Sequence, residues 1–341
     1  IFSFNSKDLT LRQYPFGDSH FNTVNSKIHS ILCDNSGNLW VAVYQKGVMM
    51  IPGQVNNFHY IGAGSVDSNL IGDACVNAIL KDGSGTLWIG TDNGGLYRIE
   101  PSGKSRHYAA GKEAPATVMS LFEDSGGTIW IGSYLKGLHR LDRRTDRIEH
   151  ISGLIDQDGK EAENIYSFAE DSDGRIWVAS MGNGLFCLDP SSGKVSRIPS
   201  DKVHNNWITS LHHSPSNRLY VGTYDGVGYL ELSGDGMAGK WLSSREIVYS
   251  IHEDNAGRLW LGTDEGLHLL DPRSGEGRLL NTDDGLPNNA VYAVCGDASG
   301  DIWTSSNSGL SRYSVTDGRF VNYYYSDGLQ GNEFTKGASF R

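Results

Sequence analysis

The chain has 341 residues, of which 38% are hydrophobic, and a formal net charge of −11 at pH 7. Its length and apolar content suit a folded chain of two ordinary domains or one large all-β domain, and 43 glycines beside 9 prolines favour tight turns over disorder. The negative charge argues against nucleic acid and anionic membranes as partners, and no apolar run is long enough to cross a bilayer.

The N-terminal stretch IFSFNSKDLTLRQYPF has no initiator methionine and no signal-peptide pattern, so we expect the chain to be a piece of a longer protein. Residues 1–4 and 9–16 are predicted to be a third and a fourth strand of a repeat. The four cysteines show no C-x-x-C pair, which argues against zinc, and each lies in or beside an apolar run, so buried free thiols are expected. They are Cys33, Cys75, Cys187 and Cys295.

One phrase, exemplified by TLWIGTDNGGLYRI, recurs along almost the whole chain. The aromatic residue of this phrase recurs at intervals of 40–48 residues. We predict that it has a structural role in the fold. The seven copies place it at Trp40, Trp88, Trp130, Trp177, Tyr220, Trp260 and Trp303. An internal repeat of this length is typical of stacked structural units rather than of an irregular fold.

Each copy predicts four short strands. In the second copy, an alternating run at 76–80 precedes an Asp–Gly turn, the LWIGT strand, a loop with glycine, a third strand and a variable fourth strand. Four strands in a repeat of this length indicate a β-propeller blade. We predict one all-β domain over residues 1–341, with repeat units at about 27–70, 75–112, 117–160, 164–203, 207–244, 247–286 and 290–328.

The prediction is a single propeller of seven four-stranded blades, with residues 1–20 and 330–341 sharing the closing region; eight blades remain an alternative. Residues 330–341 are expected to contain another first strand. In LWIG the aromatic residue and the small residue two positions later share a strand face. We expect the large ring to pack against the neighbouring blade, where the small residue leaves room.

The repeated pattern resembles the two-component regulator propeller family, on the matches LFEDSGGTIWIGSYLKGLHRLD (121–142), FAEDSDGRIWVASMGNGLFCLD (168–189), IHEDNAGRLWLGTDEGLHLLD (251–271) and NTDDGLPNNAVYAV (281–294). The fifth copy departs, with Tyr220 in place of tryptophan. The resemblance implies a periplasmic sensing domain of a membrane-anchored hybrid histidine kinase, of the kind found in Bacteroidetes, which detects oligosaccharides and can form homodimers through the parent protein.

Function is expected where the copies differ, in the loops between second and third strands and in the links between blades. These loops are predicted to share one face. Aromatic rings suit the C–H faces of sugars, and amides or charges suit their hydroxyl groups. The predicted ligand-binding residues are Tyr44, Lys46, Asp92, Tyr134, Lys136, Asn164, Trp207, Tyr224 and Asn289.

An enzyme is the alternative, because streptogramin lyases and some glycosidases are also propellers. Asp92, Asp225, Asp264 and Glu265 could supply a pair of carboxylates, and His204 could act as a base. A protein-interaction or dimerisation platform is a third interpretation. No local motif identifies a nucleophile, so the main expectation is a binding module without catalysis, cofactor, metal, nucleic acid or direct membrane insertion.

Overall fold

The computed structural model describes residues 2–5, 9–13, 17–18, 21–22, 26–34, 38–51, 58, 61, 71, 74–232, 238–243 and 245–339. Its contacts divide the chain into two compact units. The first comprises Ile1–Asp73 with Ser326–Gln330, and the second comprises Ala74–Tyr325 with Gly331–Arg341. The prediction of one domain over the whole chain stays a prediction.

The first unit contains one three-stranded antiparallel sheet, made of β5 (Ile28–Cys33), β6 (Leu39–Val43) and β7 (Gly47–Ile51). Two hairpins accompany it, β1 (Phe2–Asn5) with β2 (Thr10–Gln13) and β3 (Gly17–Asp18) with β4 (Phe21–Asn22). The strands predicted near the N-terminus are therefore present. The fourth strand expected for the first repeat falls within residues 52–70, most of which lie outside the described residues.

The second unit contains six four-stranded antiparallel sheets, each with its strands in chain order. The first three are β8 (Val76–Lys81), β9 (Leu87–Thr91), β10 (Gly95–Ile99) and β11 (Ser105–Tyr108); β12 (Val118–Glu123), β13 (Ile129–Ser133), β14 (Leu138–Asp142) and β15 (Arg147–Ile151); and β16 (Ile165–Glu170), β17 (Ile176–Ser180), β18 (Gly184–Asp189) and β19 (Lys194–Arg197).

The other three are β20 (Ile208–His213), β21 (Arg218–Thr223), β22 (Gly226–Glu231) and β23 (Ala238–Ser243); β24 (Val248–Glu253), β25 (Leu259–Thr263), β26 (Leu267–Leu270) and β27 (Gly277–Leu280); and β28 (Ala293–Gly296), β29 (Ile302–Ser306), β30 (Gly309–Ser314) and β31 (Arg319–Tyr323). Helical structure in the described residues is confined to α1 (Ser200–Val203) and the 3₁₀ turns η1 (Thr282–Asp284) and η2 (Tyr325–Asp327). None of these helices is long or apolar enough to cross a membrane.

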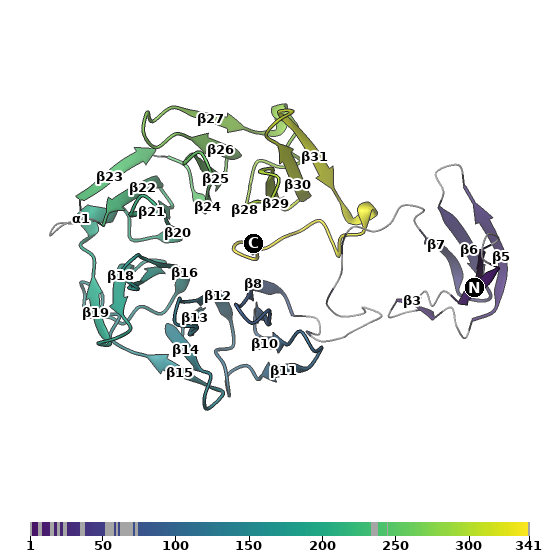
Figure 1. Ribbon diagram of the computed structural model, residues 1–341, viewed down its shortest axis with the longest axis horizontal. Helices are drawn as coiled ribbons and strands as arrows, with labels where there is room; N and C mark the ends of the chain where they lie inside the picture. Colours follow the sequence, from purple (N-terminus) through teal and green to yellow (C-terminus); the bar gives the residue numbers. More distant parts are fainter. Residues whose placement is uncertain are drawn as a thin grey trace. The chain divides into compact units, whose positions relative to one another are not determined.

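Figure 1 shows the six sheets of the second unit following one another around a common centre, with the first strand of each sheet innermost. Consecutive first strands, from β8 through β28, contact one another. The repeated phrase forms the second strand in all seven of the larger sheets, from β6 to β29. The prediction of an all-β propeller with seven blade sheets is thereby confirmed.

The Asp-rich turn and the repeated tryptophan are joined by a hydrogen bond in six sheets. The aspartate caps the turn with one carboxylate oxygen and accepts the indole N–H with the other. These bonds, 2.8–3.1 Å long, link Asp34 to Trp40, Asp82 to Trp88, Asp124 to Trp130, Asp171 to Trp177, Asp254 to Trp260 and Asp297 to Trp303. The remaining sheet has Ser214 and Tyr220 at these two positions.

The repeated aromatic residue packs against the next sheet along the chain. Trp130 is 2% exposed and belongs to a core cluster with Ile165, Phe168 and Ile176 of the following sheet. The small residue of the phrase faces that same neighbour: a methyl group added to Gly132 would lie 2.6 Å from the backbone oxygen of Ile165. The blade-to-blade junction therefore leaves no room for a side chain at this position.

Two details differ from expectation. Residues 330–339 form no strand, because the backbone of this segment bonds to single residues at the ends of β29 and β30, Ser306 and Gly309, instead of joining a ladder. The expectation of buried thiols is wrong for Cys33 and Cys75, which are exposed, while Cys187 and Cys295 are half-buried, and none of these four described cysteines is in a disulfide. Cys75 precedes strand β8 rather than lying within it, so the core does not enclose its side chain.

Candidate functional site

The loops between second and third strands lie beside the residues that lead into the first strands. In five of the six sheets of the second unit, backbone hydrogen bonds of 2.8–3.3 Å join the loop between the second and third strands to the residue before the first strand of the same sheet. In the second unit they link Asp92 to Cys75, Tyr134 to Thr117, Met181 to Asn164, Tyr224 to Trp207 and Asp264 to Ile247. The two classes of variable loop therefore meet at the same end of each of these sheets, which we call the loop face.

Two predicted aromatic residues form a stacked pair on the loop face. The rings of Trp207 and Tyr224 lie 5.6 Å apart at an interplanar angle of 29°, and their exposed fractions are 50% and 37%. Trp207 also forms an isolated β-bridge with Met181 of the preceding sheet, and its backbone N–H donates to Asn205. The pair is therefore held by the backbone yet exposes ring surface to solvent.

The first strands carry a repeated irregularity at this end. In β8, β12, β16, β20 and β24 the register shifts by one residue, so that one residue stays outside the ladder. Such β-bulges re-aim a side chain and are common next to binding sites. The bulged residues are Asn77, Met119, Tyr166, Thr209 and Tyr249, and Tyr292 holds the equivalent place before β28.

Bulged side chains of neighbouring sheets contact one another. The amide of Asn77 lies 3.7 Å from the sulfur of Met119, and the rings of Tyr249 and Tyr292 pack edge to face at 5.4 Å. Burial raises the pKa of Tyr166, and the nearby phenols of Tyr224 and Tyr134 raise it further. Two pairs of bulged side chains are therefore in contact, and Tyr166 lies near the loop aromatics Tyr134 and Tyr224.

Sequence reasoning missed the bulge residues. The signal was available: Tyr166, Tyr249 and Tyr292 each directly precede the small residue of a first strand, while the other copies have histidine, asparagine, methionine or threonine there. This position varies between copies as the loop residues do. It was not recognised because an alternating strand pattern does not reveal an inserted residue.

Tyr44 and Lys46 belong to the first unit, whereas the other predicted binding residues belong to the second unit. Tyr44 is 46% exposed and stacks on His29 at 5.2 Å, and the Lys46 ammonium lies 3.5 Å from the hydroxyl of Ser26. The candidate site on the loop face is therefore restricted to the second unit.

Three predicted polar residues hold loops in place. Asp92 accepts a 2.8 Å hydrogen bond from the Thr117 hydroxyl, Asn164 accepts one from the backbone N–H of Leu135, and Asn289 accepts one from the backbone N–H of Thr282. Their side chains shape the loops that present the aromatic rings. Tyr134, 47% exposed, and the exposed Lys136 stand on the loop that Asn164 holds.

The residues considered for catalysis are dispersed. Asp225, Asp264 and Glu265 are exposed on loops of two adjacent sheets, and the Asp264 carboxylate accepts from the backbone N–H of Ile247. His204 follows α1 and its ring lies 4.8 Å from that of Trp241, on the outermost strand β23. Among the described residues, no group of three His, Cys, Asp or Glu side chains could hold a metal ion.

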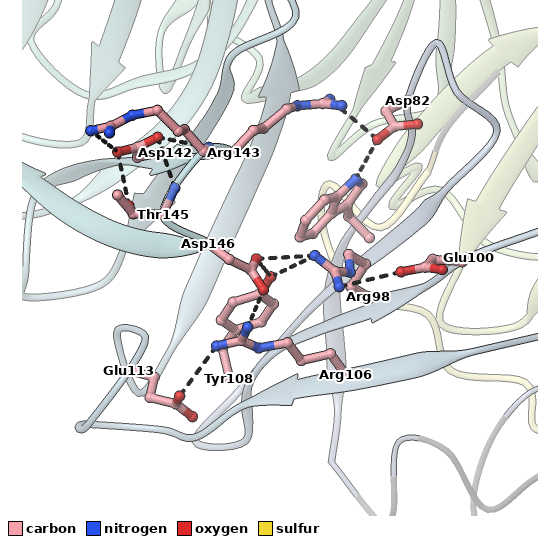
Figure 2. A network of polar contacts seen from close by, with 12 residues as sticks. Asp82, Arg98, Glu100, Arg106, Tyr108, Glu113, Asp142, Arg143, Thr145 and Asp146 are labelled. Atoms are coloured by element: carbon pink, nitrogen blue, oxygen red, sulfur yellow. Dashed lines mark hydrogen bonds and ion pairs between the residues drawn. The ribbon is translucent and has the colours of Figure 1, made fainter.

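A second polar region lies between the first two sheets of the second unit (Figure 2). Asp146, in the turn between β14 and β15, accepts from Arg98, Arg106 and Tyr108 of the neighbouring sheet. Arg143 bridges Asp82 at 3.2 Å and Glu123 at 2.7 Å. Part of this network borders a cavity of about 220 Å³, which is lined by Asp82, Thr86, Trp88, Arg98, Glu100, Leu141, Arg143 and Asp146.

Charges in this region neutralise one another. Burial acts to raise the pKa of Asp82, but hydrogen bonds from Ser84, Trp88 and the backbone outweigh it and lower the pKa. Burial and the bond to Asp146 raise the pKa of the Tyr108 phenol. Each of the three arginines has a carboxylate partner. The network therefore joins two sheets, and the loop face is the stronger candidate for ligand binding.

The repeated phrase matches the model of a known protein family. The model of the two component regulator propeller matches residues 69–93, 113–135, 159–182, 242–265 and 285–308. The chain belongs to the two-component regulator propeller family. The matched segments end in the loops between second and third strands, so the family pattern runs from each blade link to the loop face. Among curated proteins, no relative matches this propeller.

Solved structures resemble this propeller along its whole length. The extracellular domain of the hybrid two component system BT3049 from B. thetaiotaomicron matches with a TM-score of 0.71 at 22% identity, over 100% of this chain and 51% of that one. The extracellular domain of the one component system BT4673 from the same organism matches with a TM-score of 0.66 at 18% identity, over 94% and 46%. The chain therefore spans about half the length of these two domains.

An enzyme of similar architecture is also found. Virginiamycin B lyase from Staphylococcus aureus, in a catalytically inactive form with quinupristin, matches with a TM-score of 0.62 at 19% identity, over 77% of this chain and 88% of that one. Likeness at this level of identity demonstrates the propeller fold, which both sensors and enzymes use.

Proposed function

We propose that this propeller is the ligand-sensing part of an extracytoplasmic, membrane-anchored two-component sensor, and that it binds an oligosaccharide on the loop face without turning it over. Support for the sensor role comes from the family match and from the extracellular domains that share the fold. Support for the location of the site comes from the exposed aromatic rings on the loop face.

The stacked pair of Trp207 and Tyr224 is the observation that carries the proposal. Large rings exposed on a loop leave apolar surface in contact with water, which burial against a partner would relieve, so their presence points to a bound partner. Tyr134 adds a third exposed ring from another sheet, and Lys136 stands two residues beyond it. Rings with neighbouring amides and charges suit the mixed apolar and hydroxylated surface of a sugar.

Calorimetry with a panel of oligosaccharides tests the proposal. Once a binder is found, Trp207→Ala and Tyr134→Ala are each expected to weaken binding by roughly 5- to 50-fold, as truncation of a hot-spot aromatic does. The matched control is Tyr97→Ala, which removes a ring that stacks on His107 within the first sheet of the second unit. The affinity of this variant for the oligosaccharide is expected to stay within about two-fold of that of the unmodified chain, because surface contacts outside a site contribute little.

Two outcomes would overturn the proposal. Unchanged affinity after loss of Trp207, Tyr224 and Tyr134 together would place the ligand elsewhere. Product formation from the bound sugar would replace sensing with glycoside cleavage, for which the carboxylates of Asp225, Asp264 and Glu265 would be the first to examine.

A further inference from the structure

The segment 331–339 runs from the last sheet of the second unit to the first. The carbonyl of Asn332 accepts from the backbone N–H of Gly309 at 2.7 Å, and the N–H of Phe334 donates to Ser306 at 3.2 Å. The hydroxyl of Thr335 donates to the carbonyl of Val76, at the start of β8. In Figure 1 this segment is the yellow trace that enters the middle of the six sheets.

Lys336 of this segment lies against two of the bulge tyrosines. Its ammonium nitrogen is 4.2 Å from the centre of the Tyr249 ring and 5.7 Å from that of Tyr292. The two rings meet edge to face at 69°, and the hydroxyl of Tyr292 accepts a 2.8 Å hydrogen bond from Asn307. Two fixed ring faces therefore converge on one cation, at distances where cation–π attraction operates.

Two opposing effects act on the charge of Lys336. Burial lowers the pKa of Lys336, and the nearby carboxylate of Asp264 opposes that shift. Burial, followed by the same carboxylate, raises the pKa of Tyr249 to about 12, so this ring stays neutral. Within the described part of the chain, the Lys336 ammonium makes no hydrogen bond and no ion pair within 4.0 Å. The aromatic faces are its immediate partners.

We propose that Tyr249, Tyr292 and Asp264 form a site for a cationic group, and that Lys336 is its internal occupant. A ligand that carries an ammonium or quaternary amine must then displace the Lys336 side chain from the two rings. Rings that hold one desolvated ammonium group have the geometry to hold another. The exposed carboxylates of Asp225 and Glu265, on the adjoining loops, add attraction for a cation and disfavour an anionic ligand.

This inference goes beyond the proposed function, because it stands on the contacts of Lys336 and requires no glycan. Choline serves as the cationic probe, and 3,3-dimethyl-1-butanol as its neutral counterpart of the same shape. In calorimetry at constant ionic strength, Lys336→Gln is expected to bind choline about 10-fold more tightly than the unmodified chain, since the competing ammonium is gone. The matched variant Lys336→Arg keeps a cation and should retain the original affinity.

The contribution of the Tyr249 ring is tested in the Lys336→Gln variant. Adding Tyr249→Leu to Lys336→Gln should abolish the gain for choline, and the neutral counterpart should not respond to either change. Equal choline affinity for the unmodified chain and Lys336→Gln would overturn the proposal. So would a gain of the same size for the neutral alcohol.

A second measurement follows Lys336 in the unmodified chain. Reductive ¹³C-methylation labels lysine side chains, and the signal of dimethylated Lys336 is expected upfield of the other lysine signals because it lies over the Tyr249 ring. Its absence in Lys336→Arg assigns it. Choline should move this signal toward the position of the other lysines, whereas an unshifted signal in the free protein would contradict the occupied site.

Discussion

Trp130 illustrates how one side chain serves two purposes in each blade. Its ring fills the junction with the following sheet, and its indole N–H donates to Asp124 at 2.8 Å. Trp130→Ala is expected to lower the free energy of unfolding by roughly 3–5 kcal/mol, because a large cavity remains between two sheets. Denaturant unfolding measures this loss.

Trp130→Phe is the matched comparison. Phenylalanine retains much of the ring but leaves the Asp124 carboxylate without its N–H donor, so an intermediate loss is expected. If both variants unfold at the same denaturant concentration as the parent, the junction does not depend on this residue.

The His139 side chain is expected to make the stability of the fold depend on pH. Burial, followed by the neighbouring His150, lowers the pKa of His139 from 6.5 to about 4. The folded state therefore binds a proton less readily than the unfolded state, so the stability linked to this residue is present above pH 6.5 and is lost as the pH falls toward 4.

Thermal melts of His139→Phe test the linkage. The decrease in Tm between pH 6.5 and pH 4 is expected to be smaller in this variant than in the unmodified chain, because phenylalanine cannot be protonated. His150→Phe should keep most of the decrease, since burial is the larger cause. Parallel Tm curves for all three proteins would refute the assignment.

At the scale of the strand, the small residue of the phrase is determined by the neighbouring blade. A methyl group on Gly132 would lie 2.2 Å from the Ser120 hydroxyl and 2.6 Å from the Ile165 carbonyl, so backbone must move. Gly132→Ala is therefore expected to cost roughly 1–3 kcal/mol in denaturant unfolding. Gly83→Ala, whose methyl group would make only ordinary contacts, should stay within about 0.5 kcal/mol.

At the same scale, the first strands could be predicted from the sequence, whereas the bulged side chains within them could not. Alternation of apolar residues correctly indicated all six first strands of the second unit. The bulge at Tyr166 or Tyr249 adds one residue without altering that alternation in a recognisable way. Which side chain leaves the ladder depends on how the first strand pairs with the second strand. That pairing is visible only in the folded structure.

For the molecule as a whole, neighbouring sheets are joined by glutamates at the ends of first strands. Glu123 accepts from the backbone N–H of Gly83, and Glu170 from that of Ser125, each in the turn of the preceding sheet. The first and last sheets of the second unit are connected differently, through the segment 331–339. This segment is therefore expected to stabilise both sheets at once.

Removal of residues 331–341 tests that expectation by hydrogen exchange. Amides of β8 and β28 should exchange faster in the shortened chain, because their link is lost, whereas β16, enclosed by sheets on both sides, should keep its protection. Removal of residues 340–341 alone is the control. Uniform exchange rates in the two shortened chains would show that the segment does not connect the sheets.

The sequence by itself determined the blade, because the features that build it are local and repeated. Alternation, the Asp–Gly turn and the pairing of tryptophan with a small residue each operate within a few positions, and seven copies in register make the pattern unmistakable. Only the tertiary structure decided which variable residues meet. Tyr134, Tyr166 and Tyr224 come from three sheets, and Lys336 reaches Tyr249 across 87 positions of sequence. Contacts of that kind depend on how the sheets pack around their centre, which no local pattern encodes.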